Sequence, residues 1–423
     1  MADPTHTRRR VLRAVGSGLA VGSLATFGTG LGAAARPGDE TVTVTVGYAS
    51  AGGRDAALAR ALTVHYEFGF DALTLQVPES AIDVLAARRD VRYVEKDRPL
   101  GGIVTPRLQP RRRVDGQRTP YGITVTGADV AAENGFTGSG ANVAVLDTGI
   151  DSTHPDLAAN LGSGDAFVPG VGDLEGLDFP PGQDDDVLVS HGTHVAGVVG
   201  ATDNDLGVVG VSPAATLHPI KVLVGVLGGG SAAGIAAGVE FVADRGWDVV
   251  NLSLGEAGRS DVLADAVADA YARGVFVVAA AGNAGAVESD PTASDGTSTV
   301  SYPAAFEDVV AVGATDRNDD LAGFSSVGPE VELVAPGANV LSTALPVNIY
   351  SNLEEPFHRY IELSGTSFAA PHVAGAAALL MSDAGLSNVE ARERLRETAT
   401  DVGLRDVEQG HGRLDIPAAL DID

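Results

Sequence analysis

Residues 116–423 repeat one pattern, in which a short and continuously apolar run is followed by an amphipathic stretch. The apolar runs predict strands: "ANVAVLDTG", "ATLHPIKVLV", "WDVVNLSLG" and "VFVVAAAGN". The stretches beside them predict helices: "HGTHVAGVVGA", "GGSAAGIAAGVEFVADRG" and "SDVLADAVADAYARG". Strands that are apolar on both faces are typical of a parallel sheet covered by helices on both sides. The sequence therefore predicts an α/β fold built on a three-layer, mostly parallel sheet.

Polar side chains follow three of the apolar runs, where each predicted strand ends. Asp147 ends the first run, Asn251 and Ser253 end another, and Asn283 follows a third. Ligands of open parallel sheets bind outside the carboxyl ends of the strands. We therefore expect these side chains to lie at one functional edge of the sheet.

Two further polar residues stand at predicted helix starts. His191 begins "HGTHVAG", and Ser367 precedes the small and apolar "FAAPHVAGAAALL". Taken singly, Asp147 is compatible with an Asx turn, and His191 and Ser367 with helix caps. Taken together, an acid, an imidazole and a hydroxyl can form a relay in which the serine attacks a carbonyl. Asn283 and the backbone N–H of Ser367 would then stabilise the oxyanion.

Five segments, in order, resemble the signature segments of subtilisin-like serine proteases: "VAVLDTGID", "HGTHVAG", "NLSLG", "AAAGN" and "GTSFAAPHVAGAAALL". The resemblance covers roughly residues 116–420 and implies the subtilisin-like fold. It also implies that Asp147 orients His191, that His191 is general base and then acid, and that Ser367 is the nucleophile. Asn283 would line the oxyanion hole.

The same resemblance implies a substrate groove with two edges and a pocket floor. Its residues are Gly228, Gly229 and Gly230 on one edge, Ser253, Leu254 and Gly255 on the other, and Ser301 at the floor. Family members commonly carry glycine at the floor and an aromatic lid near Ala232. The chain departs from the family pattern at both places, which leaves its side-chain preference open.

A structural calcium site is also implied by the resemblance. The matching residues are Gln117, Asp156, Thr202, Asn204, Leu206 and Val208. Carboxylate, amide and carbonyl oxygens are the hard ligands that Ca²⁺ takes. The alternative is a solvated loop without an ion.

The N-terminal part predicts three further segments. Residues 1–35 have a basic start, a weakly apolar middle and a small-residue end, and "TRRRVLR" resembles a twin-arginine export signal. Residues 40–100 predict a small α+β module that resembles the family's inhibitory propeptide, most closely in "VRYVEKD". Residues 101–115 predict a cleavable linker, and residues 116–423 the peptidase domain.

The charge is distributed unevenly along the chain. Residues 1–115 carry 16 Lys+Arg and 12 Asp+Glu, whereas residues 116–423 carry 12 and 44, a formal charge of −32. Such a field disfavours binding to nucleic acid or to an anionic membrane. Because the whole chain has only two lysines, Lys96 and Lys221, we interpret the acidity as adaptation to high salt. A plainly acidic, soluble surface is the alternative.

These observations predict an exported, extracellular and monomeric endopeptidase that acts on proteins or peptides and has no mature membrane span. It would be made as a zymogen, stabilised by calcium and similar to the halolysins. The absence of cysteine excludes disulfides and a cysteine nucleophile. Two alternatives remain: a dedicated processing or signalling peptidase of the same fold, and a binding module without activity. The full set of four catalytic-type residues argues against the second.

Overall fold

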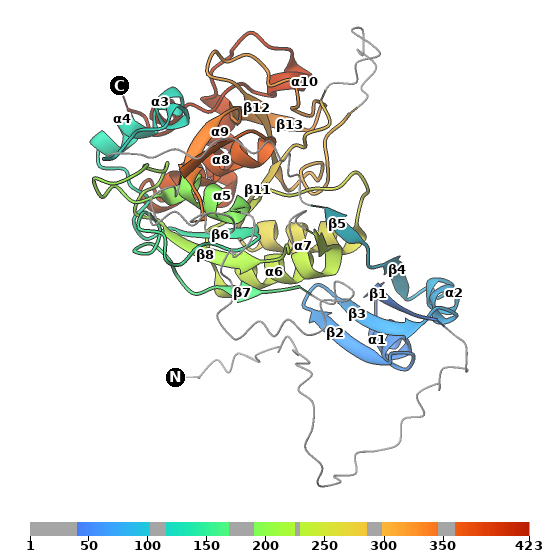
Figure 1. Ribbon diagram of the computed structural model, residues 1–423. Helices are drawn as coiled ribbons and strands as arrows, with labels where there is room; N and C mark the ends of the chain where they lie inside the picture. Colours follow the sequence, from blue (N-terminus) through green and yellow to red (C-terminus); the bar gives the residue numbers. More distant parts are fainter. Residues whose placement is uncertain are drawn as a thin grey trace, which may run out of the picture. The chain divides into compact units, whose positions relative to one another are not determined.

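The computed structural model describes residues 40–101, 116–168, 190–224, 229–285, 298–345 and 360–422 (Figure 1). The predicted signal peptide, Gly228 and nearly all of the predicted linker lie outside these residues. The chain divides into two compact units. The first comprises the described residues up to Arg98 together with Ser260–Ala266, and the second comprises Pro99–Arg259 and Val267–Asp423.

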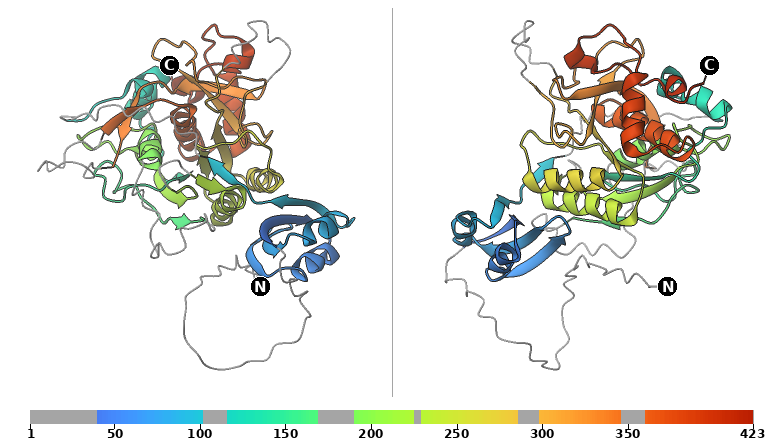
Figure 2. Two further views of the ribbon diagram at one scale, coloured as in Figure 1. Left: turned by 45° about the vertical axis from the view of Figure 1, so that its right-hand side comes forward. Right: turned by 180° about the vertical axis from the view of Figure 1, so that it is seen from behind.

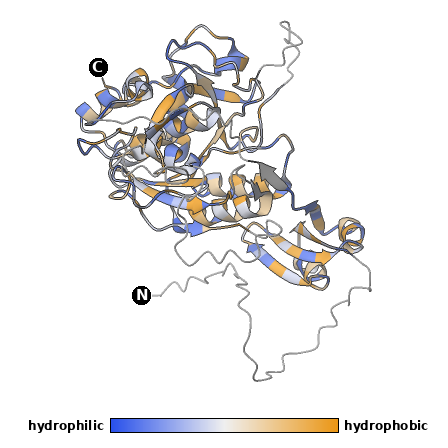
Figure 3. Ribbon diagram, in the orientation of Figure 1, coloured by the Kyte–Doolittle hydropathy of each residue, from blue (hydrophilic) through white to orange (hydrophobic). Residues whose placement is uncertain are grey.

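The first unit is built on an antiparallel four-stranded sheet with strand order β2-β3-β1-β4. Its elements are β1 (Thr41–Tyr48), α1 (Ala51–Leu58), β2 (Thr63–Phe68), β3 (Ala72–Pro78), α2 (Ala81–Ala86) and β4 (Val91–Lys96). Strand β2 was not predicted, although "TVHYEF" alternates polar residues with aliphatic or aromatic ones. Figure 3 shows hydrophilic and hydrophobic residues following one another along the strands of this unit. The core lies between the sheet and the two helices and includes Val44, Val46, Leu73, Leu75 and Leu85.

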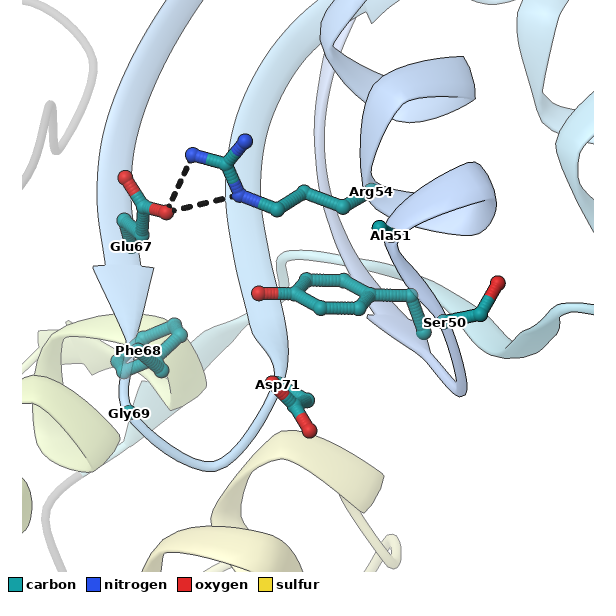
Figure 4. A pocket seen from close by; sticks show the side chains of 8 residues that line it. Ser50, Ala51, Arg54, Glu67, Phe68, Gly69 and Asp71 are labelled. Atoms are coloured by element: carbon teal, nitrogen blue, oxygen red, sulfur yellow. Dashed lines mark hydrogen bonds and ion pairs between the residues drawn. The ribbon is translucent and has the colours of Figure 1, made fainter.

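A pocket of about 410 Å³ opens in this unit (Figure 4). Arg54 and Glu67, which both line it, form an ion pair, with the guanidinium Nη2 2.6 Å from the carboxylate Oε1. Burial raises the pKa of the neighbouring Tyr48, and the charge of Asp71 adds to this shift. None of the predicted catalytic residues lines the pocket. Its lining residues are Tyr48, Ser50, Ala51, Arg54, Glu67, Phe68, Gly69 and Asp71.

The second unit contains a seven-stranded sheet with the order β13-β12-β11-β10-β6-β8-β7, and all of its neighbouring strands run parallel. The predicted α/β fold class is confirmed. The strands are β6 (Asn142–Asp147), β7 (Asp165–Ala166), β8 (Thr216–Lys221), β10 (Val249–Leu252), β11 (Phe276–Ala280), β12 (Val310–Thr315) and β13 (Val331–Pro336).

Helices cover both faces of this sheet (Figures 1 and 2). One face packs against α5 (His191–Gly200), α8 (Ala370–Ser382) and α9 (Asn388–Glu397) in a core dominated by alanine and valine. On the other face, α6 (Ala232–Arg245) and α7 (Asp261–Ala272) lie side by side. The smaller elements are β5 (Pro99–Gly101), α3 (Tyr121–Thr126), α4 (Ala128–Glu133), β9 (Gly229–Ser231), β14 (Val340–Thr343), β15 (Tyr360–Leu363), α10 (Asp406–Gln409) and α11 (Ile416–Ala419).

The helix expected to open on Ser367 begins three residues later. Ser367 lies in a single 3₁₀ turn, Thr366–Phe368, and α8 starts at Ala370 with Pro371 in its first turn. Proline lacks an N–H and is tolerated only where a helix begins, which explains this start. Among the described residues, no helix combines the length and apolar character needed to cross a membrane.

Candidate active site

Asp147 and His191 form a buried pair. Asp147 is the last residue of β6, and His191 is the first residue of α5. The Nδ1 atom of His191 lies 2.8 Å from Asp147 Oδ1 and 2.9 Å from Oδ2. A carboxylate only accepts hydrogen bonds, so Nδ1 carries the proton and Nε2 is the basic nitrogen. The pair therefore has the tautomer that a general base requires.

Local backbone geometry fixes this pair. A Cβ on Gly192 would lie 3.1 Å from Asp147 Oδ1 and would meet the carbonyl oxygen of Gly149, so only glycine lets α5 approach the strand end this closely. The backbone N–H of Gly192 donates to Thr148 Oγ1 at 3.0 Å. The N–H of Thr148 donates to Asp147 Oδ1 at 2.7 Å. Thr148 thus links the acid to the start of the histidine helix.

Ser367 is fully buried, and its turn lies against the same helix. The rings of Phe368 and His191 are 5.3 Å apart. The hydroxyl of Ser367 donates to the carbonyl of Ser253 at 3.2 Å. The hydroxyl of Ser253 in turn donates to the carbonyl of Ser367 at 2.7 Å and accepts from Asn251 Nδ2 at 2.9 Å. The structure thus brings the predicted serine to the carboxyl end of β10.

Asn283 is oriented by Thr366. Its Oδ1 accepts from the backbone N–H of Thr366 at 2.9 Å and from the Thr366 hydroxyl at 3.0 Å. The backbone N–H can only donate, so it fixes which amide atom is the oxygen. The Nδ2 donor therefore points away from Thr366, 3.2 Å from the position that a Cβ on Gly365 would take. A fixed amide donor next to a serine suits an oxyanion hole.

The predicted substrate edges lie in the second unit. Strand β9 contains Gly229 and Gly230 and pairs in antiparallel register with β5 of the same unit. The glycine-rich edge thus pairs, as a strand, with an extended segment of the chain itself. Ser253 and Leu254 are buried, and Gly255 is half-buried.

Ser301, the predicted pocket floor, is half-buried, and its N–H donates to the carbonyl of Ala281 at 2.8 Å. A Cβ placed on Gly282 would lie 2.5 Å from Ser301 Oγ. The serine side chain therefore occupies space directly beside the residue that precedes Asn283.

The predicted calcium ligands come together around one loop. Asp156 is fully buried, and its Oδ2 accepts from the N–H of Val208 at 3.0 Å. Its Oδ1 is buried and has no hydrogen-bond partner among the described residues. Gln117 Oε1 accepts from the N–H of Asp205, and Asn204 Oδ1 accepts from the N–H of Leu206, both at 2.9 Å.

Burial raises the pKa of Asp156, as expected for a carboxylate without full compensation. The described residues contain no cluster of three or more histidine, aspartate or glutamate side chains that could hold a metal. One carboxylate with amide and carbonyl oxygens is nevertheless a donor set that fits Ca²⁺. The unsatisfied Oδ1 is the atom that a cation would satisfy.

His194 supports the site as a neutral side chain. Burial lowers its pKa to about 3, and its Nε2 lies 3.0 Å from the carbonyl of Val340 and 3.2 Å from that of Ile361. Its ring packs edge-on against Phe368 at 4.5 Å between centroids. His194 thus helps to hold the turn that carries Ser367.

Comparison with known proteins identifies the family. The Subtilase family model matches residues 138–412. An alkaline protease from Shouchella clausii is 41% identical over 348 residues, which cover 82% of this chain and 78% of that protein. Subtilisin Savinase from Lederbergia lenta is 45% identical over 304 residues, which cover 72% of this chain and 99% of that protein. This chain belongs to the subtilase family.

The subtilase is accordingly a serine endopeptidase. Sequence reasoning named Asp147, His191 and Asn283 but missed the residues that orient them, Thr148 and Thr366. The sequence did contain a signal, because Thr148 directly follows Asp147 and Thr366 directly precedes Ser367. Which hydrogen bonds they make depends on the tertiary structure.

Proposed function

We propose that this subtilase is a secreted endopeptidase that cleaves peptide bonds through an acyl-enzyme on Ser367. It would be made as an autoprocessed zymogen, bind structural calcium and work in high salt. The observation that carries the proposal is the buried Asp147–His191 pair beside the turn of Ser367. A binding module would not need a carboxylate–imidazole pair, a serine and an oriented amide donor together, so the full set of Asp147, His191, Ser367 and Asn283 argues against that alternative.

In the proposed mechanism, His191 Nε2 takes the proton of Ser367 as the hydroxyl attacks the substrate carbonyl. Asp147 keeps Nδ1 protonated and stabilises the imidazolium that forms. The Asn283 amide donates to the oxyanion of the tetrahedral intermediate. His191 then returns the proton to the leaving amine, and water repeats the sequence on the acyl-enzyme. The hydroxyl of Ser367 must rotate away from the Ser253 carbonyl for attack.

Substrate would bind as an extended strand along β9, with main-chain hydrogen bonds supplying affinity. Support comes from β5, which pairs with this edge from Pro99 opposite Ser231 to Gly101 opposite Gly229. The same pairing supports the zymogen proposal, because a segment on the edge excludes substrate. Residues 40–100 would act as inhibitor and folding template, and cleavage would fall between residues 100 and 115.

The proposal is tested by expressing the full chain in molar salt with calcium and assaying casein hydrolysis. We expect the wild type to hydrolyse casein and N-terminal sequencing to place the mature start after residue 100. The variant Asn283→Ala should lower kcat by about 10²–10³, the loss known for one oxyanion donor in subtilisin. Full activity in this variant would exclude Asn283 from the oxyanion hole.

A narrower substrate range is distinguished by the same assay. Autoprocessing without casein hydrolysis would favour a dedicated processing peptidase over a broad endopeptidase. Absence of both activities, with the chain folded, would contradict the proposed function.

We further propose that calcium stabilises the folded enzyme and takes no part in the chemistry. Asp156, Gln117 and Asn204 would supply side-chain oxygens, and Thr202, Leu206 and Val208 carbonyls. A ligand that binds only the folded state stabilises it by mass action, by about 2.7 kcal/mol at a hundred times its Kd.

We expect a chelator to shorten the half-life of the wild type at elevated temperature, whereas Asp156→Ala should be short-lived with or without chelator. Asp203→Ala removes an exposed carboxylate from the same loop and should keep the wild-type response. Equal chelator sensitivity in wild type and Asp156→Ala would place the ion elsewhere. Activity measured before inactivation should not change with chelator.

A further inference from the structure

Lys221 is an unusual residue in this chain. The other 11 basic residues of 116–423 are arginines, so lysine occurs at one position of this part of the sequence. That position is the last residue of β8, which lies in parallel register directly opposite Asp147 on β6. The side chain is only 5% exposed. Burying an ammonium costs free energy unless it is paired, so the position demands a specific contact.

The ammonium of Lys221 donates to the backbone carbonyl of Thr148. Lysine ends in a compact group with three donors, whereas arginine ends in a wide, planar fork. A lysine therefore fits the buried carbonyl of Thr148, next to the end of β6, better than an arginine does. This geometry gives a physical reason for lysine at this position in an otherwise arginine-rich unit.

Thr148 is held on every side. The carbonyl of Asp147, before Thr148, accepts from the N–H groups of Val222 and Leu223 at 2.9 and 3.1 Å. The N–H of Thr148 donates to Asp147 Oδ1, and its hydroxyl accepts from Gly192, next to His191. Lys221 holds the remaining polar group, the carbonyl that leads into the turn at Gly149, where φ is +104°. Without Lys221, the carbonyl of Thr148 would lose this donor. Thr148, which links Asp147 to the start of α5, would then be held by fewer hydrogen bonds.

We propose that Lys221 is a positioning residue for catalysis: it fixes the Thr148 backbone, which orients the Asp147 carboxylate toward His191. The inference rests on the proposed function, because it needs Asp147 and His191 to act in the relay. Lys221 touches neither substrate nor reacting atoms in this assignment. Its loss should therefore lower kcat and leave substrate binding almost unchanged.

The test replaces Lys221 with methionine, an unbranched apolar side chain of similar length. Lys221→Met should lower kcat by about 10–100-fold. This is the range for residues that orient a metal ligand through a hydrogen bond, which is a comparable indirect role. KM should change by less than about threefold. The proton NMR resonance of the His191 Nδ1–H should shift or broaden. Ile220→Val shortens the neighbouring buried residue of β8 and should change neither kcat nor the resonance.

A double-mutant cycle identifies the route. In an Asp147→Ala background, Lys221→Met should cause no further loss of kcat, because residues that act as a unit are not additive. If Lys221→Met does not fold, Lys221→Gln keeps an uncharged donor and carries the same comparisons.

The possible failures are distinguishable. Wild-type kcat and an unchanged resonance in Lys221→Met would overturn the positioning role, while an inactive Asp147→Ala would leave the proposed function intact. An equal loss in both backgrounds would also overturn it, because Lys221 would then act independently of Asp147. Retained activity in Asp147→Ala would contradict the proposed function itself.

Discussion

Replacing Ser367 with alanine should abolish peptide hydrolysis and leave the fold intact. We expect kcat to fall by about 2 × 10⁶, the loss measured in subtilisin when its nucleophile is removed. The fold should persist because the substitution deletes only a hydroxyl from a buried turn. Hydrogen bonds with Gly365, Thr366 and Ser253 hold the backbone of this turn. Steady-state assays with a short chromogenic peptide measure the residual rate of hydrolysis. The variant should still bind this peptide.

The same variant reports on maturation. Full-length Ser367→Ala chain should accumulate, because autoprocessing needs the nucleophile, and a trace of active enzyme added in trans should cleave it. Ser364→Ala is a matched control, since Ser364 lies three residues upstream and its hydroxyl accepts from the N–H of Asn339 at 2.9 Å. Its kcat should stay close to that of the wild type. Undiminished hydrolysis by Ser367→Ala would refute the assigned nucleophile.

The fold class and the pairing of Asp147 with His191 were within reach of sequence reasoning. Both residues stand at element ends next to small residues, and the parallel order of apolar strands places such ends at one edge. Contact between the two side chains follows from this topology and from Gly192, which permits the close approach. The periodicity of the chain thus predicted the edge and the residues on it.

The orienting contacts could not be predicted in the same way. The orientation of the Asn283 amide depends on Thr366, which is 83 residues further along the chain. The hydrogen bond from Ser367 to the Ser253 carbonyl spans 114 residues. No local pattern encodes a side-chain rotamer that is set by a distant segment.

Other differences have local causes. The N-terminus of α8 lies after Ser367 because Pro371 favours the first turn, a signal that was visible but was outweighed by the apolar run. The strand β2 was overlooked because His65 and Glu67 make its sequence polar, even though the period of two was present. Lys221 was noted for its rarity, but its contact with Thr148 depends on the register between β8 and β6.

Lowering the salt concentration should unfold the second unit while calcium is held constant. Residues 116–423 carry 44 acidic and 12 basic residues, so 32 acids remain even if every base is paired with one acid. More than 32 acids lack a basic partner if two bases share one acid, as Arg392 and Arg396 do. Both form ion pairs with Glu332, at 2.6 and 2.9 Å. Charges interact over about 30 Å at 0.01 M salt and over about 3 Å at 1 M.

The core offers little free energy to oppose this repulsion. Alanine and valine make up most of the cluster between the sheet and α5, α8 and α9, and small side chains bury little area each. A domain is stable by only about 5–15 kcal/mol, so a modest repulsion summed over many carboxylates can exceed it. We therefore expect a cooperative transition between about 1 M and 0.05 M sodium chloride.

Trp247 provides a signal from this unit alone, because it is the only tryptophan of the chain. It is 8% exposed and stacks on His218 with ring centroids 3.6 Å apart, so unfolding should change its fluorescence. The Ser367→Ala chain is used to prevent autolysis. Sucrose separates screening from general stabilisation, because it strengthens burial without screening charge and should not replace salt fully. Fluorescence that stays native down to 0.05 M, where the screening length is about 14 Å, would contradict a folding role for salt and leave the acid surplus as a determinant of solubility.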